Sequence, residues 1–181
     1  SFIKNYNEVI KNIVNIRDVV AVTPQIEGQA LARSKDYISG VVLRGVRITD
    51  LPSKKLLWES LSNESKLNYK NREQLLIGYR LAQKLNVALG DKITLISANG
   101  IVTALGVFPQ KQSFVVGGFF NIGMFEYDNN FIFMPWQKAQ NFLLTDENTH
   151  NLEIFLKNHN DTSKIKQIIK NKINVGLTVL D

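Results

Sequence analysis

The chain has 181 residues, 44% of them hydrophobic, which suits one sizeable core or two small lobes and excludes a disordered tail. The formal net charge of +6 is spread over single and paired Lys and Arg residues, which favours a solvated surface over a nucleic-acid or other polyanion site. The absence of cysteine excludes disulfides and thiolate metal sites, and no stretch approaches the roughly 20 apolar residues of a membrane-spanning helix.

The first elements predict a helix that leads into a ribbon of strands. Apolar residues at helical spacing predict an amphipathic helix over residues 3–14. Runs of β-branched residues predict strands at 19–22, ended by Pro24, and at 25–33 and 37–46, with a turn at 34–36. The polar stretch 49–73, with a short helix after Pro52, is expected to connect into a second lobe.

The second lobe is predicted to be rich in strands. Residues 74–77 and 92–97 read as strands around a helix at 79–85 and a turn at Gly90 and Asp91, an order common where a small β-barrel begins. Strands follow at 113–120 and 131–134, an exposed turn lies between them at 121–130, and a helix follows at 136–144.

The last elements return to alternating helix and strand. We expect a strand at 152–156, a helix at 162–173 with Asp161 as its N-cap, and a strand at 175–180. The predicted fold class is α+β, with a discontinuous α/β lobe from both chain ends (1–48 and 145–181) and an inserted β-rich lobe (49–144). Since the chain begins on an amphipathic run and stops after a strand-like segment, we expect it to be part of a larger protein.

The sequence offers little for catalysis, and we predict no catalytic residue, metal or cofactor. His150 and His159 lack metal-ligand spacing, and two acidic pairs, Glu126 with Asp128 and Asp146 with Glu147, fall in turn-like sequence. A small-barrel hydrolase that uses Glu126 and Asp128 stays as a rival hypothesis. The pair at residues 117–118 (Gly-Gly) interrupts an apolar strand, which indicates a bulge or close backbone packing rather than a phosphate loop, and the strand-spaced phenylalanines indicate core.

Residues 98–112 are unusual because they are largely apolar and nearly uncharged although they lie between two strands. Such a segment either folds back over its own lobe or projects and binds a partner, and the sequence leaves both open. Gly100 and Gly106 at its shoulders, with Pro109 on the return, suit a protruding hairpin or hook.

Several segments, taken in order, carry a family resemblance: VLRGV (42–46), LIGYRLAQKL (76–85) with GDKI (90–93), TALGVFP (103–109), FVVGGFF (114–120) and MPWQKAQ (134–140). Together they resemble the periplasmic domain of LolC/LolE permeases of the lipoprotein-releasing ABC transporter, with MacB-type exporters and FtsX as more distant relatives. The resemblance implies an α/β (Porter-like) lobe and an inserted (Sabre-like) lobe on the periplasmic side of the inner membrane. It also implies three partners: a second permease subunit, a separate cytoplasmic ATPase and an acylated lipoprotein as cargo. Because the ATPase is a separate subunit, this chain is expected to be no enzyme.

In that family a hook on the inserted lobe recruits the periplasmic lipoprotein chaperone. The matching residues are Thr103, Ala104, Leu105, Gly106, Val107, Phe108 and Pro109, with Lys111 and Gln112 at the position of a polar pad. The LolC pattern resembles Thr-Pro-Met-Gly at the hook, whereas this chain has Ala104 in the place of that proline. A LolC-type, LolE-type or hybrid subunit therefore stays open, and the alternative is a MacB-like or FtsX-like mechanotransmission or regulatory domain that recruits no chaperone.

Overall fold

The structure, a computed structural model, describes residues 3, 5–104, 106–145, 149, 151–158 and 162–172. Its contacts divide the chain into two compact units, unit 1 (Ser1–Gln25 with Asn148–Asp181) and unit 2 (Ile26–Glu147). Both chain ends thus belong to unit 1, and the segment between them forms unit 2. The division falls after Gln25 rather than after residue 48, because the strand at 37–46 pairs along its length inside unit 2.

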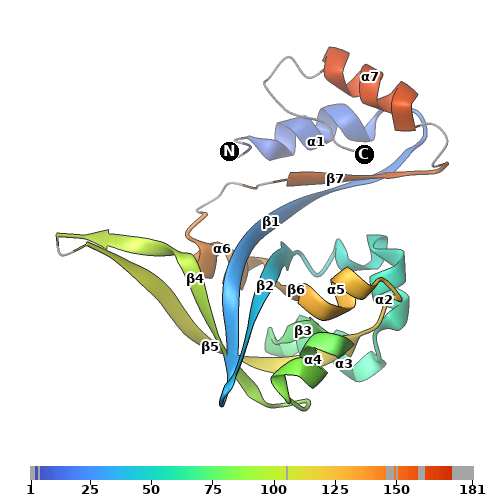
Figure 1. The fold of residues 1–181 in the computed structure, drawn as a ribbon. Helices are drawn as coiled ribbons and strands as arrows, with labels where there is room; N and C mark the ends of the chain where they lie inside the picture. Colours follow the sequence, from blue (N-terminus) through green and yellow to red (C-terminus); the bar gives the residue numbers. More distant parts are fainter. Residues whose placement is uncertain are drawn as a thin grey trace. The chain divides into compact units, whose positions relative to one another are not determined.

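Unit 1 is a two-stranded antiparallel sheet packed with two helices (Figure 1). Residues 19–25 of β1 (Val19–Ser34) pair with β7 (Asn151–Leu156), and helices α1 (Tyr6–Val14) and α7 (Thr162–Lys172) supply apolar side chains. The buried side chains that these elements share are Ile13, Ile16, Val22, Ile165 and Ile169. The helices predicted at 3–14 and 162–173 and the strand at 152–156 are therefore confirmed, although the first helix begins only at Tyr6 and Ile3 forms a β-bridge with Thr149. Asp161 and the strand predicted at 175–180 lie outside the described residues.

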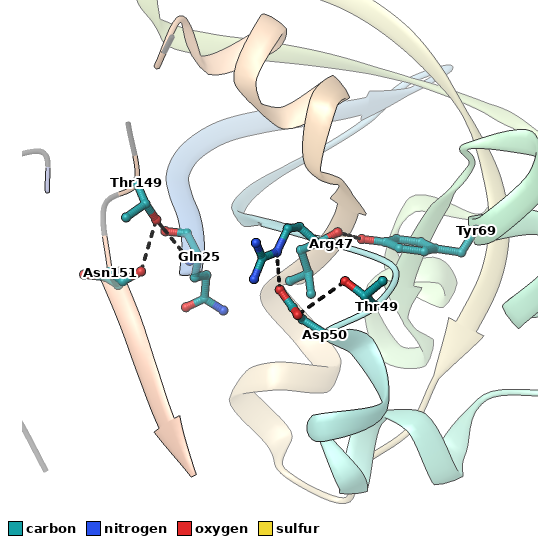
Figure 2. Close-up of polar contacts among 8 residues, drawn as sticks. Gln25, Arg47, Thr49, Asp50, Tyr69, Thr149 and Asn151 are labelled. Atoms are coloured by element: carbon teal, nitrogen blue, oxygen red, sulfur yellow. Dashed lines mark hydrogen bonds and ion pairs between the residues drawn. The ribbon is translucent and has the colours of Figure 1, made fainter. Parts of the chain in front are cut away.

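Thr149 ties three segments of unit 1 together (Figure 2). Its hydroxyl accepts the Gln25 N–H at 3.1 Å and lies 2.7 Å from the Gln25 carbonyl oxygen and 3.1 Å from that of Asn151. Its own carbonyl accepts the Ile3 N–H at 2.8 Å. Because this side chain is fully buried, each of these contacts replaces one that water would otherwise make.

The prediction that Pro24 ends a strand is wrong, since β1 runs without interruption from Val19 to Ser34. Pro24 pairs with Leu152 of β7, and pairing of β1 with a second neighbour begins only at Ile26. In a strand with one neighbour, alternate N–H groups point away from that neighbour, so a proline at such a position removes no ladder hydrogen bond.

Unit 2 is built around six strands that close on themselves. Their order is β2-β6-β3-β5-β4-β1, and a further pairing of β1 with β2 (Tyr37–Val46) completes the ring. The remaining strands are β3 (Leu75–Gly78), β4 (Lys92–Thr103), β5 (Gly106–Phe120) and β6 (Phe131–Pro135). The small barrel that the residues after position 74 suggested is therefore present, and β1 and β2 complete it.

Helices of unit 2 pack around this barrel (Figure 1). They are α2 (Lys55–Ser60), α3 (Asn63–Arg72), α4 (Tyr79–Leu85), α5 (Phe125–Asn130) and α6 (Trp136–Leu143), with a 3-10 turn at Leu51–Ser53. One apolar cluster joins the strands to α4 and α6, and a second joins them to α2 and α3. The predicted core phenylalanines are buried at 114, 120, 131 and 133 and partly buried at 119, whereas Phe125 is 67% exposed.

Helix α3 was predicted as a polar connection, and that prediction is wrong. Its buried face consists of Ser65, Asn68 and Tyr69, so it lacks the apolar stripe from which helices are recognised. These side chains suit the surface they cover: the Asn68 amide donates to the Gly117 carbonyl at 2.9 Å, and Ser65 fills the space beside Gly118. The close packing expected at these two glycines is therefore confirmed, and Gly117 also lies at a register shift between β3 and β5.

Two predicted irregular segments are regular. Residues 121–130 end in helix α5 rather than forming only a turn. Residues 98–112 are not a loop, because β4 continues to Thr103 and β5 begins at Gly106.

Candidate partner-binding hairpin

The far halves of β4 and β5 form a two-stranded ribbon. Pairing of β4 with β1 stops at Ser97, and pairing of β5 with β3 begins at Val116, so among the described residues the segment between them pairs only within the hairpin. Six residues of strand beyond Ser97 give the ribbon a length of roughly 20 Å. Figure 1 shows it leaving the barrel of unit 2.

The ribbon closes in a tight turn. The last pair of residues is Thr103 with Gly106, so only two positions lie between the strands. Gly106 has a φ of +122°, a conformation that residues with a Cβ adopt rarely, and this explains the glycine at that position. The register shifts between Ile96 and Gly100, which places an irregularity where the ribbon leaves the barrel.

Near the turn, the described side chains of the ribbon face water. Ala104, Gly106 and Pro109 are exposed, and the Phe108 side chain is 53% exposed although it is large and aromatic. A two-stranded ribbon has no second layer that could cover such a ring, so the ring is available to a partner. The side chains of Thr103 and Val107, and the whole of Leu105, lie outside the described residues.

Lys111 and Gln112, which the sequence grouped as one polar pad, are both exposed but face opposite ways. Lys111 pairs with Ile96 and Gln112 with Leu95, and neighbouring residues of a strand point to opposite faces. By the same alternation Phe108 shares a face with Gln112, and Pro109 shares a face with Lys111. A partner that contacts the whole predicted set must therefore reach around the ribbon.

An open apolar hollow of about 620 Å³ lies in unit 2 at the base of the ribbon. Its lining includes Leu31, Gly40, Val42, Ile96 and Pro109. No atom lies within 4 Å of where a Cβ on Gly40 would stand, so this glycine opens the floor of the hollow. No sequence pattern indicates this hollow, because its lining comes from two strand pairs, β1 with β2 and β4 with β5, that are distant in the chain.

The acidic pair Glu126 and Asp128 consists of one exposed and one buried residue. The Asp128 side chain is 2% exposed, and its carboxylate accepts the N–H groups of Ile122 at 2.9 Å and Gly123 at 3.1 Å. Glu126 is exposed. The described residues contain no group of three or more His, Cys, Asp or Glu side chains that could hold a metal, and His150, His159, Asp146 and Glu147 lie outside them.

Arg44 makes several polar contacts that the sequence did not reveal. Its Nε donates to Glu27 Oε2 at 2.9 Å, its Nη1 donates to the Tyr127 hydroxyl at 2.8 Å, and the guanidinium lies 4.6 Å from the centre of the Phe131 ring. These groups lie on β1, β2, α5 and β6 and hold α5 against the barrel.

Comparisons with known proteins agree on one family. Residues 4–172 match the MacB-like periplasmic core domain. The chain is 27% identical over 159 residues to the lipoprotein-releasing system transmembrane protein LolC of Neisseria meningitidis serogroup B, a match that covers 84% of this chain and 37% of that protein. The LolC of Xylella fastidiosa strain Temecula1 is 26% identical over 129 residues, covering 71% of this chain and 31% of that protein. The chain thus spans well under half the length of these relatives.

Solved structures show the same mixed α+β fold at low sequence identity. The extracellular domain of the noncanonic ABC-type transporter YknZ from Gram-positive bacteria superposes with a TM-score of 0.58 and 12% identity, over 94% of this chain and 83% of that one. The periplasmic region of MacB from Actinobacillus actinomycetemcomitans superposes with a TM-score of 0.51 and 13% identity, over 91% of this chain and 72% of that one.

None of the helices in the described part of the chain is both long and apolar enough to cross a membrane. The family match, by contrast, runs from the first helix to the end of α7 and includes both units and the ribbon. The chain therefore belongs to the family of MacB-like periplasmic core domains, and LolC proteins are among the relatives of the chain.

Proposed function

We propose that this chain is the extracytoplasmic domain of an inner-membrane ABC transporter permease that helps release lipoproteins and pass them to a periplasmic chaperone. The LolC names of two relatives, with 84% of this chain covered in one of them, support this proposal. Unit 1 then corresponds to the Porter-like lobe and unit 2 to the Sabre-like lobe. A second permease subunit and a cytoplasmic ATPase complete the transporter, and this chain catalyses no reaction itself.

In this proposal the ribbon binds the chaperone, and the half-exposed Phe108 is the observation that carries it. An aromatic ring that no other layer of its own unit covers can bury a large apolar area against a partner at a small cost in side-chain entropy. Gly106 and Pro109 set the shape of the tip, and Lys111 adds attraction to acidic groups. Because Phe108 and Lys111 lie on opposite faces of the ribbon, the chaperone is expected to surround the hairpin.

The closed barrel gives the domain a mechanical role. Six strands paired in a ring move as one body, so a displacement of the barrel displaces the ribbon with it. Movement that the transporter produces at the membrane would then reach the bound chaperone while the acylated lipoprotein leaves the bilayer.

The test measures capture of the purified lipoprotein chaperone by the chain and by Phe108→Asp. A charge at the centre of an apolar contact should cost at least about 2 kcal/mol of binding, which lowers the affinity roughly 30-fold. Phe125→Asp is the matched control, because Phe125 is also exposed, belongs to unit 2 and lies on α5. Its capture of the chaperone should equal that of the parent chain.

Equal capture by the parent chain and by Phe108→Asp would contradict the proposal that the ribbon binds the chaperone through Phe108. If the parent chain itself binds no chaperone, the alternative is favoured, namely a MacB-like or FtsX-like domain that transmits force without recruitment. The likeness of the fold to the MacB periplasmic region is the observation that supports this second candidate.

A further inference from the structure

Helix α7 is the most basic element of unit 1. Its sequence, TSKIKQIIKNK, has four lysines in 11 residues and no acidic residue. The side chains of Lys164 and Lys170 are exposed and lie about 9 Å apart along the helix axis. Positive charge is otherwise spread thinly along the chain, whereas this helix concentrates four lysines.

The apolar side of α7 is already occupied. Ile165 and Ile169 are 3% and 4% exposed and belong to the core of unit 1. The exposed positions are polar or basic and include Gln167 and Asn171 beside the two lysines. The helix therefore has no free apolar stripe for insertion into a bilayer, and its outer face suits a contact made by charge and hydrogen bonds.

Helix α7 lies at one end of the family match. Both ends of the family match, residues 4 and 172, belong to unit 1, and α7 is the last described helix before the second of these ends. The relatives are named transmembrane proteins, and this chain covers only 37% and 31% of two of them. Most of the length of these two transmembrane proteins therefore lies outside the matched segment, and both ends of the family match belong to the unit that contains α7.

From these observations we infer that the exposed face of α7 lies on the headgroups of anionic phospholipids. Lysine amines on flexible four-carbon stems reach lipid phosphates without moving the helix out of its core. This contact orients the domain on the bilayer by a surface other than the ribbon, and so goes beyond the proposed binding of a chaperone. Polybasic segments near anionic membranes gain roughly a five-fold increase in binding for each lysine.

The experiment is co-sedimentation of the chain with phosphatidylcholine vesicles that contain or lack phosphatidylglycerol, at low salt. We expect binding only to the vesicles with phosphatidylglycerol, and its loss at high salt. Lys164→Gln with Lys170→Gln should weaken this binding roughly 25-fold, since two lysines are removed. The matched control is Lys70→Gln with Lys84→Gln, which removes two exposed lysines of unit 2 and lowers the net charge equally.

Equal losses in the two double variants would overturn the proposal, because binding would then follow net charge rather than α7. Competition by free glycerol phosphate at the same phosphate concentration would show a soluble anion as the occupant and would also overturn it. Phe108→Asp should bind vesicles as the parent chain does, and the α7 variant should capture the chaperone normally. Failure of one proposal is therefore distinguishable from failure of the other.

Discussion

The hydroxyl oxygen of Tyr69 lies 2.8 Å from the carbonyl oxygen of Val46 and 2.8 Å from that of Met134. One side chain of α3 thus joins the ends of the parallel strands β2 and β6. The ring is 2% exposed, so these contacts have no competition from water. This hydroxyl fixes α3, the helix with little apolar surface, onto the barrel.

Tyr69→Phe should lower the free energy of unfolding by about 1–2 kcal/mol, because two buried carbonyl groups lose the hydroxyl between them. Urea unfolding followed by circular dichroism measures this change. Tyr79→Phe is the control, since Tyr79 is 47% exposed. Its free energy of unfolding should stay within about 0.5 kcal/mol of the parent.

The same contact predicts a dependence of stability on alkaline pH. Burial raises the pKa of Tyr69 well above its ordinary value, because the phenolate would lose its hydration. The unfolded chain releases this proton near pH 10 while the folded chain retains it, so stability falls as the pH rises above about 10. Tyr69→Phe has no phenolic proton to release, so its stability does not fall in this way. The difference in unfolding free energy between the parent chain and this variant should therefore shrink between about pH 8 and pH 11 in the urea experiment. A deficit that is constant over this range would contradict the burial of the hydroxyl.

Gly78 allows α5 to lie directly against the end of β3. A Cβ at this position would overlap the backbone carbonyl of Asp128, which cannot move without displacing the helix. Gly78→Ala should therefore lower the free energy of unfolding by about 1–3 kcal/mol, as overpacking does elsewhere. Gly40→Ala is the matched control in a strand of the same barrel, because the added methyl group meets open space. Similar losses in both variants would mean that the approach of α5 is not tight.

The Asp128 carboxylate holds the segment that precedes α5. It accepts two backbone N–H groups, from Ile122 and Gly123, and it is buried. Asp128→Ala leaves both donors without this partner and should cost about 1.5–3 kcal/mol of stability, measured by urea unfolding. Glu126→Ala, which removes an exposed carboxylate two residues earlier, should have little effect. Destabilisation by Asp128→Ala alone supports a structural role for this carboxylate and not the acid-base role considered from the sequence.

The strands of the barrel could be predicted because their side chains alternate or form apolar runs between turn residues. Helix α3 could not, since its buried positions are Ser65, Asn68 and Tyr69, and only the glycines of β5 explain why such residues are buried. The prediction that Pro24 ends a strand was wrong for a similar reason. Whether a proline ends a strand depends on how many neighbouring strands pair at that point, and this depends on the tertiary structure.

The hairpin proposed as the binding site could be located from the sequence, but the directions of its side chains could not. Low charge and the glycines at its shoulders indicated residues 98–112, and a hairpin is present there. The faces of Lys111 and Gln112 follow from the register with Ile96 and Leu95, which no local pattern reveals. The hollow is lined by residues of β1, β2, β4 and β5, so it could not be predicted from the sequence either.

Substitutions in the turn of the ribbon can test how much conformational entropy the turn loses when the chaperone binds. Ala104 is exposed and follows the extended Thr103, so a proline at this position is compatible with the residue before it. Under the proposed function, Ala104→Pro removes freedom from the unbound turn and should tighten chaperone binding by about 0.4–1 kcal/mol, roughly two- to five-fold. Ala104→Gly adds freedom and should weaken binding by a similar factor. Titration calorimetry with the purified chaperone measures both, with unfolding midpoints as the control for the fold. Unchanged affinity in both variants would show that order in the turn does not limit binding, even if Phe108 makes the contact.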